Sequence, residues 1–212
     1  MINIAEVVKE LISADYVHLE SLRTHTLNLH AYASLIQPTI ELRAKKPVKV
    51  GSIVMALSRL SKSLASVPEL IPTVVIETLV VKSGLTVVNY EKTSKLIAIL
   101  SQASIARSDR DFFVISEALA EIAIVAPNEN MKVIEALIPY QPKSKFTDAV
   151  AITLRFGIDY VVIPNVLYAF VSTLAMRRIN LLEIVSTLTE VAFIIENKDM
   201  DVAVDIFKRF LP

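Results

Sequence analysis

The chain has 212 residues, a formal net charge of zero, and hydrophobic residues at 53% of its positions. Its three glycines, at positions 51, 84 and 157, cannot form a GxGxxG dinucleotide-binding motif or a P-loop. The absence of cysteine excludes disulfides and thiolate metal sites. Together with only three glutamines, it favours a protein of a thermophilic, archaeal cytoplasm.

The apolar residues recur mainly at helical spacing. Between residues 15 and 37, His18, Leu22, Leu29 and Ile36 fall close to one line at about 100° per residue. Prolines stand between such runs, and scarce glycine disfavours tight β-hairpins. We therefore expect helices over residues 3–14, 16–36, 39–46, 50–65, 69–83, 89–105, 110–126, 129–138, 145–157, 160–177, 181–196 and 199–210.

The segment at residues 73–90 has two interpretations. It is dense in β-branched residues and is interrupted by Lys82-Ser83-Gly84, which is typical of a hairpin. A lysine followed closely by glycine is equally a signal for the end of a helix. We favour a helix, and a small β-hairpin at 73–90 is the alternative.

A weak internal repeat is visible in the second half of the chain. Residues 121–131 (EIAIVAPNENM) align with residues 190–200 (EVAFIIENKDM), an offset of 69 (190 − 121). This offset is close to two helix hairpins of about 30–40 residues each, the unit of helical solenoids. Chance similarity between two amphipathic helices is the alternative explanation.

The predicted fold class is therefore all-α, with about eleven to twelve helices in antiparallel hairpins. The arrangement resembles a HEAT/armadillo-like solenoid, and an irregular bundle is the alternative. We expect one continuous domain, in which an N-terminal helical segment with a basic turn (1–48) leads into a helical-repeat-like region (49–212).

The longest stretch without a formal charge is Tyr160–Met176. It is shorter than the roughly twenty apolar residues that a transmembrane helix needs, and it contains Pro164 and Asn165. We therefore expect a buried helix here, no membrane insertion, and a cytoplasmic protein.

The sequence offers little material for catalysis. All three histidines, at positions 18, 25 and 30, fall in one expected helix. His18 and His25 would be about 10 Å apart along its axis, too far to bind one zinc ion. Asp15 and His18 could supply two metal ligands, but no second such pair follows. We expect no catalytic residues, no cofactor, no metal site and no enzymatic activity.

A basic segment within residues 42–68 is the best functional lead, because it contains no acidic residue. Its six cations are candidate contacts for nucleic acid or another anion: Arg43, Lys45, Lys46, Lys49, Arg59 and Lys62. A helix ending near residue 46, a short turn and a helix over 50–65 would form a helix-turn-helix, with 73–90 as a possible wing. A plain solvated surface is the competing interpretation, since no aromatic residues interleave with the cations for base stacking.

Charge is unevenly distributed along the chain. Residues 1–108 carry 12 basic and 8 acidic side chains, whereas residues 109–212 carry 10 basic and 14 acidic ones. Opposite charges on two halves favour head-to-tail association, and the high apolar content favours a covered surface. We predict a non-enzymatic scaffold or protein-interaction protein that binds a protein partner or its own copies. The alternative is a nucleic-acid-binding protein that uses residues 43–62.

Overall fold

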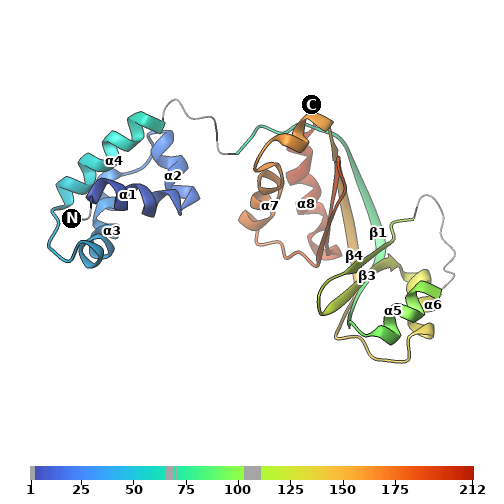
Figure 1. Ribbon diagram of the computed structural model, residues 1–212. Helices are drawn as coiled ribbons and strands as arrows, with labels where there is room; N and C mark the ends of the chain where they lie inside the picture. Colours follow the sequence, from blue (N-terminus) through green and yellow to red (C-terminus); the bar gives the residue numbers. More distant parts are fainter. Residues whose placement is uncertain (1–2, 65–68, 70, 103–110) are drawn as a thin grey trace. The chain divides into compact units, whose positions relative to one another are not determined.

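The chain folds as two units, a helical unit (Met1–Leu70) and a sheet unit (Ile71–Pro212) (Figure 1). The computed structural model describes residues 3–64, 69, 71–102 and 111–212. The division expected from the sequence, after residue 48, falls between two helices of the helical unit. The predicted helix over 89–105 extends past residue 102, and its last residues lie outside the described part of the chain.

The helical unit contains α1 (Ile4–Ser13), α2 (Tyr16–Arg23), α3 (Leu29–Ala44) and α4 (Val50–Leu64). Three of these helices begin with a side-chain cap, in which an Asn or Asp oxygen accepts a hydrogen bond from a backbone N–H of the first turn. The capping residues are Asn3, Asp15 and Asn28. Aliphatic side chains from all four helices form one buried core.

The boundaries within this unit differ from the predicted ones at two points. The predicted helix over 16–36 is broken, because α2 ends at Arg23 and His25 adopts a left-handed conformation (φ 59°). Pro38, expected between two helices, lies inside α3. A proline removes a single backbone hydrogen bond from a helix, and here the helix continues because its buried face packs against α4.

The sheet unit is built on six antiparallel strands in the order β2-β3-β1-β4-β6-β5. The strands are β1 (Ile76–Glu91), β2 (Val114–Glu117), β3 (Glu121–Pro127), β4 (Ser144–Phe156), β5 (Glu183–Ser186) and β6 (Glu190–Glu196). Between them lie α5 (Ser94–Gln102), α6 (Asn128–Leu137), α7 (Val166–Met176) and α8 (Met200–Phe207). Short 3₁₀ helices follow β4 (η1, Ile158–Val162), β6 (η2, Asn197–Asp199) and α8 (η3, Lys208–Phe210).

The all-α, HEAT-like prediction is therefore wrong. The predicted helices over 69–83, 110–126, 145–157 and 181–196 correspond mainly to strands. In β3 and β6 five consecutive residues are buried, so the sequence shows an apolar run without alternation. Such a run looks the same in a buried helix and in a strand that is covered on both faces.

The segment at 73–90 is neither a helix nor a hairpin, because most of it belongs to the single strand β1. Gly84 has a φ of +72°, and the pairing register with β4 shifts between Lys82 and Leu85. The glycine that suggested a helix end or a hairpin turn therefore marks a β-bulge, where a positive φ is accommodated without a change of strand direction.

The sequence repeat is confirmed, but its structural unit is not a helix hairpin. Residues 121–131 and 190–200 form β3 with the start of α6, and β6 with the start of α8. The preceding turns match as well, since Ala118 donates to the Glu121 carbonyl (2.9 Å) and Thr187 donates to the Glu190 carbonyl (2.8 Å). Each half of the sheet unit is thus a βαββα module, and the two modules share β1 and β4.

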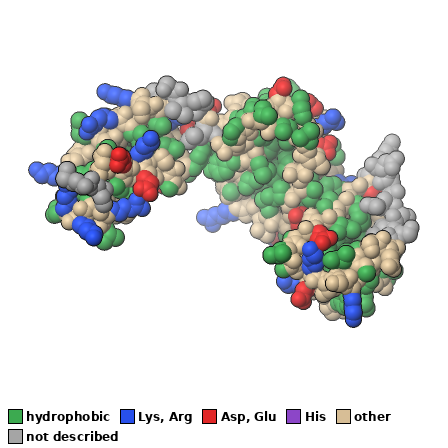
Figure 2. All heavy atoms as spheres, in the orientation of Figure 1, with side chains coloured by type: hydrophobic (Ala, Val, Ile, Leu, Met, Phe, Trp, Pro, Cys, Tyr) green, Lys and Arg blue, Asp and Glu red, His purple; other side chains and the backbone are tan. Residues whose placement is uncertain are grey.

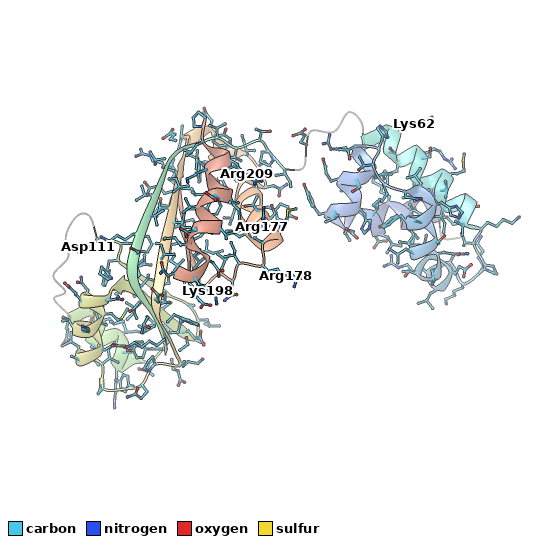
Figure 3. All side chains as sticks on the ribbon, turned by 180° about the vertical axis from the view of Figure 1, so that it is seen from behind. Lys62, Asp111, Arg177, Arg178, Lys198 and Arg209 are labelled. Carbon is cyan, nitrogen blue, oxygen red and sulfur yellow. The ribbon has the colours of Figure 1, made fainter. Side chains whose placement is uncertain are left out.

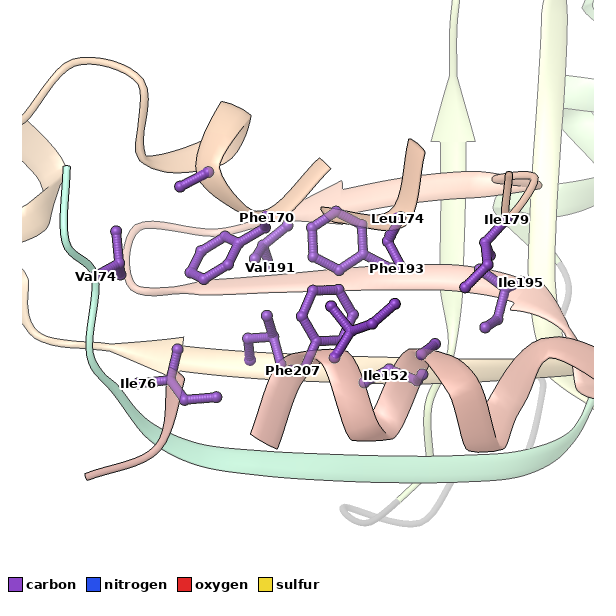
Figure 4. Close-up of a cluster of buried hydrophobic side chains, with 14 of the residues drawn as sticks. Val74, Ile76, Ile152, Phe170, Leu174, Ile179, Val191, Phe193, Ile195 and Phe207 are labelled. Carbon is purple, nitrogen blue, oxygen red and sulfur yellow. The ribbon is translucent and has the colours of Figure 1, made fainter. Parts of the chain in front are cut away.

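One face of the sheet carries all four long helices. Side chains at alternate positions of β4 and β6 pack against α7 and α8, where Phe170, Phe193 and Phe207 form an aromatic cluster (Figure 4). The rings of Phe193 and Phe207 stack with centroids 5.2 Å apart. The corresponding positions of β1 and β3 pack against α5 and α6. Each module therefore has its own core on this helix-bearing face.

The other face of the sheet is also largely buried. Four residues of the central strands are fully buried there: Leu85, Val125, Ala149 and Ile194. Partly buried hydrophobic side chains in the edge strands β2 and β5, and in the residues just before these strands, pack over them. Glu183 lies on the same face, because it pairs with Ile194 in the ladder. Burial raises the pKa of the Glu183 carboxyl, and a backbone hydrogen bond at Ile184 offsets only part of that effect.

Replacing Phe193 by alanine is expected to destabilise the sheet unit by about 3–5 kcal/mol, because a fully buried ring leaves a cavity between sheet and helices. Urea denaturation of the full chain, followed by circular dichroism, measures this loss. Phe146→Ala is the matched control, since Phe146 is 37% exposed and should change stability far less. Equal losses in the two variants would contradict the placement of the aromatic core.

Replacing Glu183 by glutamine is expected to stabilise the chain at pH 7. A raised pKa means that the folded state binds the proton more tightly than the unfolded chain does. The stabilisation from protonation is complete below the unfolded value of about 4.3 and is lost as the pH rises through the folded pKa. Urea midpoints at pH 4 and pH 7 test this, and a gain that is identical at both pH values would contradict it.

Candidate functional site

A cavity of about 690 Å³ lies in the second module of the sheet unit. Three segments meet around it: the connection from β4 to α7, the first half of α7, and the turn between β5 and β6. This size falls within the range of small-molecule sites, about 300–1,000 Å³. The cavity is our candidate functional site.

Its shape depends on a long connection that the first module lacks. Only residues 92–93 separate β1 from α5, whereas residues 157–165 separate β4 from α7 and include η1. The Tyr160 hydroxyl accepts a hydrogen bond from the backbone N–H of Val75 (3.0 Å), which ties η1 to the chain just before β1. Asn165 takes a left-handed conformation (φ 68°) directly before α7 begins.

The cavity is predominantly apolar. Its wall continues into the module core, because Phe156 and Phe170 line it and their ring centroids lie 6.1 Å apart. The apolar lining is completed mainly by Val161, Ile163, Val166, Leu167, Leu188 and Val191. The polar lining residues are uncharged, namely Tyr160, Asn165, Tyr168, Ser186 and Thr187. Such a site can bury an apolar molecule and offer it a few hydrogen bonds, but its walls supply no full charge to bind an ion.

Two smaller cavities, of about 440 and 270 Å³, lie in the first module. Both are bordered by Glu135 and Lys145, whose side chains form an ion pair at 2.6 Å. Because these two charges already satisfy each other, the cavities offer a weaker case for ligand binding than the large apolar one.

The six cations predicted as anion contacts all lie in the helical unit, around α3, α4 and the turn between them. Arg43 pairs with Glu10 (3.0 Å), and Arg59 donates to the Met55 carbonyl (3.3 Å). Lys45 ends α3 in a left-handed conformation, and Lys46 and Lys49 follow in the exposed turn. The structure therefore brings Arg43, Lys45, Lys46 and Lys49 close to one turn.

Lys62 lies apart from that turn, near the far end of α4 (Figure 3). At about 1.5 Å per residue, it is about 18 Å along the helix from Val50. On the face of the helical unit seen in Figure 2, Lys and Arg side chains are spread around the rim and do not form a single patch. The possible wing at 73–90 does not form, because residues 76–91 are a single strand of the sheet unit.

Two of the three histidines, His18 and His25, make structural side-chain contacts, whereas His30 is exposed. His18 Nδ1 lies 2.5 Å from Asp15 Oδ2, and the His18 ring packs on Tyr32. Burial raises the pKa of Asp15, but the hydrogen bonds from His18 and its positive charge lower it more, so the net shift is downward. Within the described residues, no cluster of three or more His, Asp or Glu side chains could hold a metal ion.

His25 links two helices of the helical unit. The Ser61 hydroxyl donates its hydrogen to the Leu22 carbonyl (3.0 Å), so His25 Nδ1, 2.9 Å away, must be the donor to Ser61 Oγ. This chain of hydrogen bonds joins the end of α2 to α4.

Sequence reasoning missed the cavity, although a signal for it was present. The uncharged stretch Tyr160–Met176, which the sequence also raised as a membrane segment, supplies the end of η1 and all of α7 and therefore much of the cavity wall. Among the described helices, none is both long and apolar enough to cross a membrane. The β5–β6 turn that completes the wall lies more than ten residues further along the chain, and only the folded structure brings it there.

No family model matches the chain, and no curated protein matches it. Solved structures with a similar fold do exist. The aspartate kinase of Synechocystis has a TM-score of 0.52 and 15% sequence identity, over 65% of this chain and 27% of that chain. The regulatory subunit of aspartate kinase from Thermus flavus has a TM-score of 0.51 and 12% identity, over 64% of this chain and 98% of that chain.

A third similar structure is the aspartate kinase of Clostridium acetobutylicum, with a TM-score of 0.50 and 14% identity, over 69% of this chain. Our chain spans only 37% of the length of that enzyme. At these identities the likeness shows the fold alone, which is mixed α/β. It agrees with the antiparallel sheet and not with a helical repeat.

Replacing Tyr160 by phenylalanine is expected to destabilise the sheet unit by about 1 kcal/mol, because the Val75 N–H loses its acceptor. Hydrogen exchange of the Val75 amide should accelerate in the same variant, and this readout reports on η1 directly. Tyr140→Phe is the control, since Tyr140 is exposed. Unchanged exchange at Val75 would show that Tyr160 does not hold the start of β1.

Proposed function

We propose that the sheet unit is a regulatory module that binds a small, uncharged, apolar molecule in the cavity between η1, α7 and the β5–β6 turn. The observation that carries this proposal is the composition of the cavity wall. Aliphatic and aromatic side chains dominate it, and the polar lining residues are neutral. A charged ligand would lose its hydration there without gaining an ion pair.

The asymmetry between the two modules supports a role for the cavity beyond folding. The first module closes its β–α connection with two residues and has a core of its own. In the second module the equivalent connection is nine residues long, and an open apolar cavity lies beside it. Exposed apolar side chains on this connection, such as Val161 and Ile163, need a reason to be there, and a bound apolar molecule would cover them.

The similar structures support a regulatory role at the level of analogy. Among them is a protein described as the regulatory subunit of an aspartate kinase, which this chain covers almost completely. A regulatory module acts through another protein or another domain, so the proposal includes a protein partner and no catalysis by this chain itself. The fold relatives lend no support to the nucleic-acid alternative.

The proposal predicts selective binding of uncharged probes. Indole and n-hexanol should bind and raise the unfolding temperature of the full chain, whereas the carboxylates indole-3-acetate and hexanoate should bind at least about tenfold more weakly, because they must desolvate a charge. Isothermal titration calorimetry and thermal unfolding measure the two effects. Stronger binding of the carboxylates would contradict the proposal.

A matched pair of variants locates the binding. Leu167→Trp enlarges a side chain that lines the cavity and is 48% exposed, so it should fill the cavity and abolish indole binding. Leu137→Trp makes the same change on α6 of the first module, at a residue that is 46% exposed, and should leave binding unchanged. Equal effects of the two variants would place the binding elsewhere.

A further inference from the structure

The first half of β1 has an open edge. β1 pairs with β4 from Ile76 onwards, but its pairing with β3 begins only at Leu85 (Figure 1). Among the described strands, the segment Ile76–Lys82 therefore has a neighbour on one side only. Within the described part of the chain, its outward backbone N–H and C=O groups have no strand partner, and such groups can pair with another strand.

The outer edges of the sheet are protected against such pairing. The edge strands β2 and β5 are only four residues long, and each carries a glutamate, Glu117 or Glu183. Short length and charge are the usual means by which sheet edges avoid association.

The corresponding inner edge, at the start of β4, is protected by charge. Residues 144–146 pair with β1, residues 147–148 lie at a shift in that register, and none of the five pairs with β6; they include Lys145 and Asp148. Lys145 pairs with Val88 in the first module, and Val81 pairs with Ile152 in the second. Val88 and Ile152 are equivalent positions of the two modules, so their partners Lys145 and Val81 are equivalent too. The open edge of β1 therefore has a valine where the start of β4 has a lysine.

The open edge of β1 has no charged residue from Thr78 to Val81. Val80 is 56% exposed and Val81 is 38% exposed, although the segment is a well-formed strand. An exposed apolar edge of this length is a template for strand addition. Of the four open edges in the described sheet, it has the longest run without a charged residue.

We propose that this edge pairs with the same edge of a second copy of the chain, in antiparallel orientation. The charges at its ends support this occupant. Glu77 lies near one end of the segment, 3.6 Å from Arg155, and Lys82 ends it, 3.9 Å from Asp111. Both side chains are partly exposed, so antiparallel alignment places the acidic end of one copy beside the basic end of the other, where the two can also contact each other. Parallel alignment would bring like charges together.

We place the two-fold axis of such a pair at Val80, midway between Thr78 and Lys82, so that Lys82 of one copy lies opposite Thr78 and next to Glu77 of the other. Directly opposed residues in an antiparallel ladder share a face, and symmetry then sets Val80 opposite Val80 of the second copy. Exposed valines from the two copies would cover each other. Since one strand pair buries little surface, we expect a reversible dimer whose population depends on concentration.

Analytical ultracentrifugation of the full chain over a wide concentration range tests the proposal. The mass of the wild type should rise from 23.5 kDa toward twice that value. In Val80→Lys, two lysines would face each other at the axis, and the dissociation constant should rise at least about tenfold. Thr147→Lys adds the same charge on the other inner edge and should dimerise like the wild type.

Hydrogen exchange of the wild type at low and high concentration gives a second test that needs no variant. Amides of Ile76–Lys82 should exchange more slowly at high concentration, whereas those of residues 144–148 should not change. A mass of 23.5 kDa at every concentration would overturn the proposal. So would a folded Val80→Lys that dimerises as the wild type does, or protection confined to another strand.

Discussion

The pairing of β1 with β4 is the interaction on which the rest of the sheet unit depends. These are the two longest strands, and each contributes to both modules. β1 packs on α5 and α6 in one part and belongs to the core under α7 and α8 in the other, whereas β4 packs on α7 and α8 and reaches α6 through the Lys145–Glu135 ion pair. Replacing a core residue in one module therefore disturbs a strand that also supports the other module. The bulge at Gly84 lies near the transition between the two cores and lets one strand change its register without ending.

The two modules repeat the same fold and differ in what surrounds it. The sequences of β3 and β6 align, the turns before them have equivalent backbone hydrogen bonds, and each strand is followed by a helix, α6 or α8. The differences lie at two places: the connection before α7, which forms the apolar cavity, and the open edge of β1, which lacks the lysine of its counterpart. In a duplicated framework the core can stay the same while these two places diverge. The connection before α7 is the proposed site for a small apolar molecule, and the open edge of β1 is the proposed site for a second copy.

The helices with one buried face could be predicted from the sequence. The predicted segments 3–14, 50–65 and 129–138 match α1, α4 and α6 within one residue at each end, since their apolar residues recur every three to four positions and capping or turn residues stand at most of their ends. β6 could not be told from a helix, because burial on both faces removes the alternation that identifies a strand. The cavity could be predicted only in part: Tyr160–Met176 stood out as uncharged, but the residues opposite it come from another segment.

The sequence by itself determined the composition of the cores, the absence of glycine-built phosphate motifs and cysteine sites, and the 69-residue repeat, because these depend only on residue types and their order. The tertiary structure decided what the repeated unit is, which edges of the sheet stay open, and where uncharged side chains enclose a cavity. These properties depend on contacts between segments far apart in the chain. Such contacts form because they bury apolar area and pack well in the folded unit as a whole, and a local pattern of residues does not predict which segments will meet.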